Sequence, residues 1–297
     1  MVLITGTTGF VGKNLVNFIH NSYQLKLLGR TDLNDIGKLS FKDAEVVIHL
    51  AGKAHDLKKV TDPQEYYKIN YELTKDLYTV FLKSEAKKFV FVSSVKASAD
   101  SVLDSLSESN IPNPQTHYGK SKLMAEQFIQ NEPLPAGKSY YILRPCMIHG
   151  PGNKGNLNLL YQLVKRNIPY PLAAFENKRS FLSIENLCFV IKELIERDDI
   201  ASGTYQISDD EPLSTNEVVR ILSASINKDA KLWRISPELI RLVAKLGDKL
   251  HLPLTTERLN KLTENYVICN KKIKNAIGKD LPLNSRKGLE ITASSFK

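Results

Sequence analysis

Tyrosine and lysine stand four residues apart at three places in this chain, a spacing that puts both side chains on one face of a helix. A phenol beside an ammonium can exchange a proton with an alcohol or ketone oxygen, because the positive charge lowers the tyrosine pKa from its usual value of about 10. The three pairs are Tyr71 with Lys75, Tyr118 with Lys122, and Tyr161 with Lys165. At least two of them must be accidental.

The surrounding sequence favours Tyr118 and Lys122. Tyr118 begins a predicted helix just after the polar loop 110–114, and this helix follows a strand that ends at Ser93 and Ser94. Open α/β sheets bind ligands at the carboxyl ends of their strands, so we expect Ser94 to hydrogen-bond the oxygen that Tyr118 protonates. The alternatives are a surface Tyr–Lys pair and a serine that only caps the strand end.

A glycine-rich turn near the N-terminus predicts a dinucleotide site. Gly6, Gly9 and Gly12 lie between a predicted strand at Val2–Thr5 and an amphipathic helix. Glycines let the backbone approach a pyrophosphate closely, and the N–H groups and dipole of the helix N-terminus stabilise its charge. The spacing alone is a weak signal, and the alternative is a tight turn without a ligand. Its strand–turn–helix setting makes dinucleotide binding the favoured interpretation.

The end of the second predicted strand bears on the choice between NAD and NADP. An acidic residue there would hold a ribose 2′-hydroxyl, but the strand Leu25–Leu28 continues into Gly29 and Arg30. Arg30 could face a 2′-phosphate, which slightly favours NADP, or it could stack on adenine or face solvent. Asp32 is a weaker candidate for a ribose or adenine contact.

Short β-branched segments alternate with segments of helical periodicity, the pattern of parallel strands joined by crossover helices. We predict strands at Val2–Thr5, Leu25–Leu28, Val46–His49, Phe89–Ser93 and Tyr140–Leu143. The sequence therefore predicts an α/β fold, a Rossmann-type doubly wound parallel sheet with a smaller, partly interleaved C-terminal substrate domain. The dinucleotide-binding domain would cover 1–148, with 181–207 returning to it, and the substrate domain would be mainly 149–297.

Composition excludes several classes of protein. The chain has 297 residues, of which 42% are hydrophobic and 25% charged, and this usage speaks against a collagenous, low-complexity or disordered protein. Three widely spaced cysteines predict neither a disulfide framework nor a zinc site. No segment approaches the roughly 20 apolar residues of a membrane-spanning helix, and no secretory leader is evident, so we expect a cytoplasmic protein without integral membrane contact. The net charge of +9 suits a small polyanion, whereas nucleic acid is disfavoured because no aromatic platform accompanies the basic residues.

Together the motifs resemble those of extended short-chain dehydrogenase/reductases that act on nucleotide sugars. The motifs that occur in the same order are the glycine turn, Val47–Gly52, Ser93-Ser94, Tyr118–Lys122 and Arg144-Pro145. Within that family the chain is most similar to the UDP-glucose 4-epimerase-like branch that includes UDP-4-keto-6-deoxy-N-acetylglucosamine 4-reductases of surface-polysaccharide synthesis. The segments 93–96, 150–156 and 177–187 carry this closer resemblance.

The resemblance implies roles for residues along the whole chain. The catalytic residues would be Ser94, Tyr118 and Lys122, with Asn70 bracing the active-site helix. The cofactor would contact Gly6, Gly9, Phe10, Val11, Gly12, Arg30, Asp32, Leu33, Leu50, Ala51, Gly52, Tyr118, Lys122 and Pro145. The substrate would contact Ser94, Lys96, His55, Asn156, Arg179 and Arg258, and the last three of these would hold uridine diphosphate, to which arginine forks are suited. Met147 and His149 would lie near the nicotinamide.

The implied activity is an NAD(P)-dependent oxidation or reduction at carbon 4 of a UDP-hexose. The better-known epimerases carry an acid and an aromatic residue where this chain has Arg30 and Lys96. These departures favour reduction of a UDP-4-keto-6-deoxy-N-acetylhexosamine over the alternative, a UDP-glucose or UDP-N-acetylglucosamine 4-epimerase. A second alternative is a non-catalytic, cofactor-binding regulator. Only fifteen residues, Thr31 to Glu45, separate Arg30 from the next strand, which compresses the adenine-binding region.

Two surfaces bear on partners. The helix with Tyr118 and the preceding helix from Tyr66 to Leu82 could pair with a second copy, since the family commonly forms such homodimers. Further on, apolar residues recur at helical spacing from Leu239 to Leu250. Internal packing is the default interpretation of this stripe, and contact with a membrane or a lid over the substrate are the alternatives.

Overall fold

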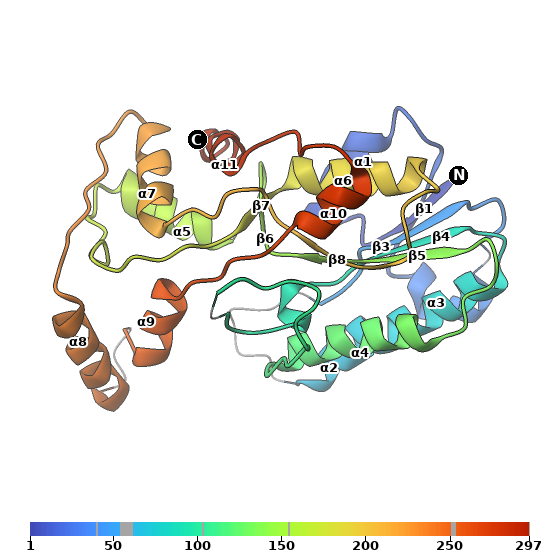
Figure 1. Cartoon of the computed structure of the whole chain (residues 1–297), viewed down its shortest axis with the longest axis horizontal. Coiled ribbons are helices and arrows are strands. Elements are labelled where there is room, and N and C mark those ends of the chain that lie inside the picture. The colour runs from blue at the N-terminus through green and yellow to red at the C-terminus, as the bar shows by residue number, and fades with distance from the viewer. Residues whose placement is uncertain (40, 54–61, 103, 154, 251–253, 297) are drawn as a thin grey trace.

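The computed structural model describes residues 1–39, 41–53, 62–102, 104–153, 155–250 and 254–296 (Figure 1). Its core is a six-stranded parallel sheet in the order β2-β1-β3-β4-β5-β8. The strands are β1 (Val2–Thr5), β2 (Leu25–Leu28), β3 (Val46–His49), β4 (Lys88–Val92), β5 (Ser139–Pro145) and β8 (Gly203–Ile207). The predicted Rossmann-type sheet is confirmed, with β4 and β5 beginning one residue earlier than expected and β5 ending two residues later.

Helices cover both faces of this sheet, as the apolar stripes of the sequence require (Figure 1). On one face lie α1 (Phe10–Ile19), α6 (Ile184–Glu196) and α10 (Lys271–Ile277). On the other lie α2 (Gln64–Tyr67), α3 (Leu73–Lys83) and α4 (His117–Asn131), and a π-helical turn, Lys68–Glu72, joins α2 to α3. Leu15 and Ile19 of α1 and Leu77 and Phe81 of α3 are fully buried against the strands.

The strand order reverses direction between β1 and β3, which is where sheets of this type bind ligands. Thr5 stands level with Leu28 of β2 and with His49 of β3. The loops that follow these three strands therefore emerge side by side at one edge. After β2 the chain makes only two short 3₁₀ turns, Asp32–Asn34 and Ile36–Lys38, before it reaches β3, which matches the predicted compression.

The rest of the chain forms a second cluster at the other end of the molecule (left in Figure 1). A short parallel pair, β6 (Met147–His149) and β7 (Phe181–Ser183), leads from the main sheet towards it. The helices of this end are α5 (Asn156–Lys165), α7 (Thr215–Ala224), α8 (Pro237–Leu250), α9 (Thr256–Thr263) and α11 (Ser285–Ser294). Leu157, Tyr161, Val219, Leu222 and Leu289 form part of its buried core. None of the helices in the described ranges has the length and apolar character needed to cross a membrane.

Candidate active site

The glycine turn after β1 forms one wall of a cleft of about 840 Å³ at the reversal point of the sheet. Gly6 has φ +71°, and a Cβ atom on it would lie 2.5 Å from the Ala51 nitrogen. A Cβ atom on Gly12 would lie 2.3 Å from the Gly6 carbonyl oxygen. Only glycine fits at these two positions, so the turn has the close backbone approach that a pyrophosphate site requires.

Half of the residues predicted to bind the cofactor are brought together in this cleft. Those that line it are Gly6, Gly9, Arg30, Leu33, Leu50, Ala51 and Gly52. Phe10, Val11 and Gly12 instead open α1 directly after the turn, and Pro145 ends β5 outside the lining. The structure adds lining residues from the π-helical turn and α3, Lys68, Ile69, Glu72, Leu73 and Asp76, which the sequence did not single out.

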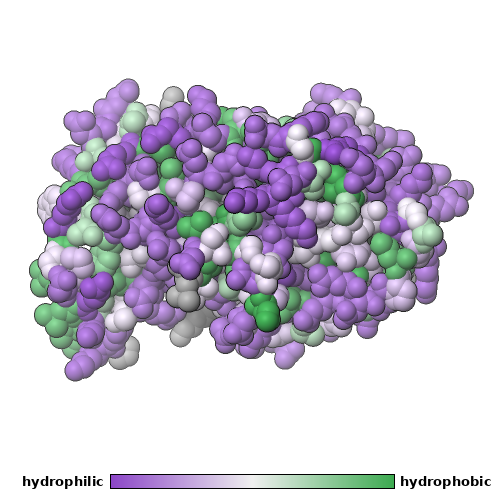
Figure 2. All heavy atoms as spheres, viewed as in Figure 1, coloured by the Kyte–Doolittle hydropathy of each residue, from purple (hydrophilic) through white to green (hydrophobic). Residues whose placement is uncertain are grey.

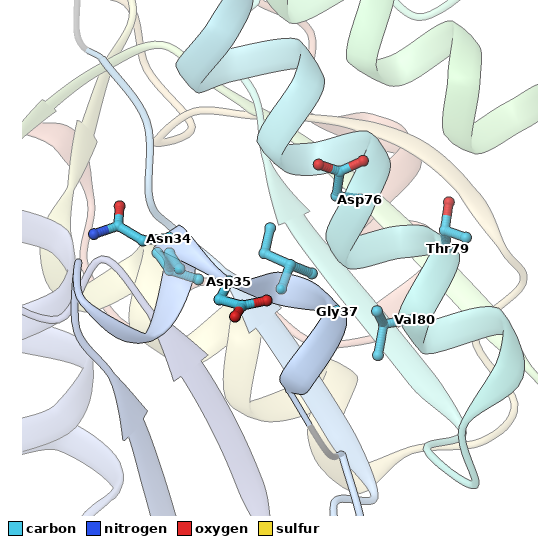
Figure 3. A pocket seen from close by; sticks show the side chains of 8 residues that line it. Asn34, Asp35, Gly37, Asp76, Thr79 and Val80 are labelled. Carbon is cyan, nitrogen blue, oxygen red and sulfur yellow. The ribbon is translucent and has the colours of Figure 1, made fainter.

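Carboxylates gather at the end of the cleft next to β2. Asp32 folds back so that its Oδ2 accepts a hydrogen bond of 2.7 Å from the Gly29 backbone nitrogen. A neighbouring pocket of about 340 Å³ shares Leu33 with the cleft and is lined by Asp35 and Asp76 (Figure 3). A carboxylate therefore stands at the end of β2 although the sequence has none directly after the strand.

Tyr118, Lys122 and Ser94 converge at the carboxyl end of β4. Helix α4 begins at His117 because the Thr116 side chain accepts a hydrogen bond from the Gly119 nitrogen, 3.2 Å away. One turn further on, the buried Lys122 Nζ donates to the Val92 carbonyl oxygen at 3.0 Å. The Tyr118 phenol hydrogen-bonds with the Ser94 side chain. The other two Tyr–Lys pairs lie elsewhere, in the π-helical turn with α3 and in α5.

Burial controls the ionisation of both α4 side chains. Desolvation raises the pKa of Tyr118, and only the hydrogen bond with Ser94 opposes it, while Tyr66 and Glu126 add to the rise. Desolvation also lowers the pKa of Lys122 to about 8, against the opposing effect of Glu126. The expected lowering of the phenol pKa is therefore wrong, because loss of hydration outweighs the hydrogen bond with Ser94.

Asn70 lies where the loop after β3 meets α4. It is fully buried in the π-helical turn, and its amide holds the Lys53 backbone on both sides, accepting from the nitrogen at 2.8 Å and donating to the oxygen at 3.1 Å. Its Nδ2 also donates to Ser121 Oγ at 3.1 Å. A Cβ atom on Gly52 would be 3.0 Å from Asn70 Oδ1 and 3.1 Å from Lys122 Nζ. Asn70, Lys122 and the cofactor cleft therefore meet at Gly52.

A buried histidine that the sequence did not single out connects β1 to the π-helical turn. Thr5 Oγ1 accepts from two backbone nitrogens of the loop after β3, so its proton goes to His49 Nδ1, 2.8 Å away. His49 Nε2–H then faces Thr74 Oγ1 at 3.0 Å, and the Thr74 hydroxyl donates to the Asn70 carbonyl oxygen at 2.8 Å. Burial lowers the His49 pKa to about 3, which keeps the ring neutral. A polar residue in an otherwise apolar strand was the only signal.

The predicted substrate residues do not form one cluster in the described part of the structure. Arg179 Nη1 donates to the Lys261 carbonyl oxygen of α9 at 2.8 Å, and Arg258 lies on the same helix. Lys96 turns inwards, with Nζ 2.8 Å from the Asp100 carbonyl oxygen and 4.3 Å from the centre of the Tyr266 ring. Asn156 opens α5, but its side chain is outside the described part of the structure. His55 lies in 54–61, which are outside the described residues.

His149 is held in a buried polar contact, and its place near the nicotinamide, which the resemblance implied, stays a prediction. Its ring is fully buried at the end of β6, where Nδ1 lies 2.8 Å from Thr292 Oγ1 of α11 and Nε2 lies 3.7 Å from Asp209 Oδ2. Met147, two residues earlier, packs against the core of the C-terminal cluster. Both residues lie outside the cleft lining, as do Ser94, Tyr118 and Lys122.

Comparisons with known proteins agree with this geometry. The sequence model of the NAD dependent epimerase/dehydratase family matches residues 2–208. A UDP-glucose 4-epimerase of Vibrio cholerae is 30% identical over 99% of this chain and 95% of its own length. The N-acetyl-alpha-D-glucosaminyl-diphospho-ditrans,octacis-undecaprenol 4-epimerase of Escherichia coli O157:H7 is 28% identical over 76% of this chain and 72% of its own. The solved UDP-N-acetylglucosamine 4-epimerase of Bacillus cereus shares the fold, with a TM-score of 0.75, 20% identity, and coverage of 98% of this chain and 97% of that one.

Proposed function

Because the chain belongs to the NAD dependent epimerase/dehydratase family, we propose that it is a nucleotide-sugar 4-epimerase of the UDP-glucose or UDP-N-acetylglucosamine type. The observation that carries the proposal is the meeting of Tyr118, Ser94 and Lys122 at the carboxyl end of β4, with Lys122 against Gly52 of the cofactor cleft. Relatives that carry out 4-epimerisation support this reaction over the reduction that the sequence favoured.

The residues of the site have different roles in the proposed reaction. The nicotinamide dinucleotide, for which the glycine turn is shaped, supplies reversible hydride transfer when bound. Tyr118 takes the proton of the C4 hydroxyl and later returns it, and Ser94 holds the same oxygen in line. Lys122 lies one helical turn after Tyr118 with its Nζ against Gly52 of the cleft, and its ammonium would stabilise the phenolate that Tyr118 must present before it takes the C4 hydroxyl proton.

The substrate's diphosphate would bind next to α9. Arg179 and Arg258 both belong to this part of the protein, and guanidinium forks match diphosphate oxygens better than any other side chain. The Escherichia coli relative is named for a sugar carried on a diphosphate-linked lipid, and the Vibrio cholerae relative for a UDP-sugar. The shared chemistry of a hexose joined to a diphosphate is what the arginines support here.

We propose NAD as the cofactor. The Asp32 carboxylate at the end of β2, together with Asp35 and Asp76 nearby, would repel a 2′-phosphate and could accept from ribose hydroxyls. This reverses the slight preference for NADP that Arg30 suggested, since Asp76 lines the same cleft as Arg30 and Asp35 lines the adjoining pocket.

Arg30 nevertheless supports a second candidate, the NADPH-dependent reduction of a UDP-4-keto-6-deoxy-N-acetylhexosamine. The sequence argument for a reductase also rested on Lys96. The Lys96 amine, however, donates to the Asp100 carbonyl oxygen within the protein, so it gives the reductase no further support. The 4-epimerase therefore comes first.

The proposal is tested by incubating purified protein with UDP-glucose or UDP-N-acetylglucosamine, without added cofactor, and identifying the products by NMR. We expect interconversion of the C4 epimers. Turnover of a 4-keto sugar with added NADPH, and no epimerisation, would establish the reductase instead.

Tyr118→Phe should lower kcat by at least about 1000-fold with unchanged cofactor binding, since the proton donor and acceptor is lost. Tyr161→Phe, from the Tyr–Lys pair in α5, is the matched control. Full activity of Tyr118→Phe would contradict the assigned role.

A further inference from the structure

Helix α8 carries an apolar stripe that no described part of the chain covers. Ile240, Ala244 and Gly247 face the core of the C-terminal cluster. The residues of the stripe are 41% to 66% exposed, and they are Leu239, Leu242, Val243, Leu246 and Leu250. Figure 2 shows hydrophobic side chains gathered at the end of the molecule where Figure 1 places α8. The default expectation that these residues pack internally is wrong for this half of the stripe.

Basic residues run along one border of the stripe. Arg241, Lys245 and Lys249 follow each other at intervals of four. The Arg241 guanidinium lies 5.6 Å from the centre of the Phe175 ring, whereas Lys245 and Lys249 are exposed and, at 3.6 residues per turn, lie on the side of the helix away from the core. Both carboxylates of α8 are engaged with neighbouring hydroxyls. Asp248 Oδ2 accepts from Thr256 Oγ1 at 2.6 Å, and Glu238 accepts from the Ser236 hydroxyl. Helix α8 therefore keeps a small positive balance, with three basic side chains against two carboxylates.

The segment just before α8 also has exposed apolar and basic side chains. Trp233 is 57% exposed, and Lys231 and Arg234 flank it on exposed positions. Residues 231–250 together contain five lysines and arginines against two acidic residues. Exposed tryptophan and leucine bordered by basic side chains are the composition of helices that lie in the interface of a bilayer.

We propose that α8 docks this protein on an anionic membrane surface, with its leucines at the boundary of headgroups and acyl chains and its lysines against lipid phosphates. A second copy of the chain is the less suitable occupant. An antiparallel two-fold contact through this face would bring Lys245 and Lys249 of two molecules to the same side and set like charges together. Anionic headgroups instead complement the same lysines, because basic side chains near such a surface are attracted to its negative potential.

The docking helix is joined to the site where the diphosphate would bind. Asp248 of α8 holds the first turn of α9 through the Thr256 nitrogen at 3.0 Å and its hydroxyl, and α9 carries Arg258. Arg179 contacts the same helix at Lys261. This step rests on the proposed function: docking through α8 would place the diphosphate site near the bilayer, within reach of a sugar diphosphate carried on a lipid.

The test is flotation of the full-length protein with vesicles. We expect binding to vesicles of phosphatidylethanolamine with phosphatidylglycerol, weakened by salt, and none to pure phosphatidylcholine. Leu242→Ser/Leu246→Ser should lower the partition coefficient by about tenfold or more, because two apolar side chains no longer enter the interface. Lys245→Glu/Lys249→Glu should abolish the preference for anionic lipid. The controls are Ile111→Ser, at a 90% exposed apolar residue elsewhere, and Lys83→Glu/Lys87→Glu, which makes the same change of charge on the nucleotide-binding side.

Activity towards a soluble UDP-sugar without vesicles separates this proposal from the proposed function. The α8 variants should keep that activity, since none of the exchanged residues belongs to the active site. Equal flotation of wild type and both α8 variants, or no flotation at all, would overturn the docking proposal even if epimerisation is found. A wild-type dimer in light scattering that becomes a monomer in Leu242→Ser/Leu246→Ser, without vesicle binding, would show that a second copy covers the face.

Discussion

Exchange of Glu126 for glutamine should strongly destabilise the protein. Glu126 on α4 is fully buried, and Arg144 Nε of β5 donates to both of its oxygens, at 3.1 and 3.0 Å. The Ser93 hydroxyl at the end of β4 also donates to it. Removing one partner of a buried ion pair leaves the other charge desolvated and uncompensated, which costs about 3–5 kcal/mol. The guanidinium of Arg144, whose side chain is 5% exposed, would be in that position.

The expected loss of stability in Glu126→Gln is large enough to measure by standard unfolding experiments. A loss of about 3–5 kcal/mol in the free energy of unfolding corresponds to a fall of about 10 °C in Tm for a chain of this size. Urea denaturation followed by circular dichroism and differential scanning calorimetry would both report it. Glu85→Gln, which removes the same charge from an exposed position, should change stability by less than about 0.5 kcal/mol.

A double variant distinguishes the effect of the uncompensated Arg144 charge from the effect of changed side-chain packing. Glu126→Leu/Arg144→Met removes both charges, so most of the loss seen in Glu126→Gln should be recovered, because apolar residues often replace a buried ion pair without cost. A loss below about 1 kcal/mol in Glu126→Gln would refute the reasoning, since Arg144 would then have to find hydration or another partner. A double variant as unstable as the single one would show that packing, rather than the charge left in Arg144, sets the cost.

Three further predictions follow from buried contacts of the site. Gly6→Ala should weaken NAD binding by at least about 100-fold in calorimetry, because its Cβ would strike the wall of the cleft, whereas Gly137→Ala, also at positive φ but in open space, should not. Thr74→Val should lower kcat about tenfold with little change in KM, because the carbonyl of the π-helical turn loses its donor. Thr79→Val, which breaks a similar bond on the exposed side of α3, should leave both constants unchanged. His49 should make the protein less stable as the pH falls. Its pKa of about 3 in the folded protein lies below the unfolded value of 6.5, so only the unfolded state gains a proton between these limits, and about 2 kcal/mol is lost by pH 5. His49→Gln should flatten this part of the profile of unfolding free energy against pH, measured by urea titration.

Each of these predictions has an outcome that contradicts it. Equal NAD affinity in Gly6→Ala would mean that the pyrophosphate does not approach the turn. Equal effects of Thr74→Val and Thr79→Val would remove the positioning role of Thr74. A wild-type stability that is flat between pH 7 and 5 would mean that His49 is hydrated enough to accept a proton in the folded state.

The fold could be predicted from the sequence because its strands are local patterns. β1, β2 and β3 have the predicted bounds, since short apolar, β-branched runs stop at glycine or polar residues. The sixth strand, β8, mixes polar and apolar residues as Gly-Thr-Tyr-Gln-Ile, and only pairing with β5 makes it a strand. Its presence was expected only as a segment that returns to the sheet.

Two features of the site could not be predicted because they depend on contacts far apart in the sequence. The segment Lys68–Glu72 has ordinary helical periodicity, and its π-helical turn arises where Asn70 holds the loop at Lys53. The carboxylate at the end of β2 comes from Asp32, three residues late, through a 3₁₀ turn that folds it back to Gly29. Spacing along the chain made Asp32 only the weaker candidate for a ribose or adenine contact.

The buried polar residues explain why the site is already formed at the edge of the sheet. His49 joins β3 to β1 and to α3, and Glu126 joins α4 to the ends of β4 and β5. Burying either side chain without its hydrogen-bond partners would cost free energy. The contacts of each residue therefore fix the relative positions of the elements that carry the site. Lys122 and Asn70 are then held at Gly52 before any ligand arrives. A polar residue in the middle of an apolar strand or helix face is thus the sequence signal that most deserves testing, although its partners become known only from the fold.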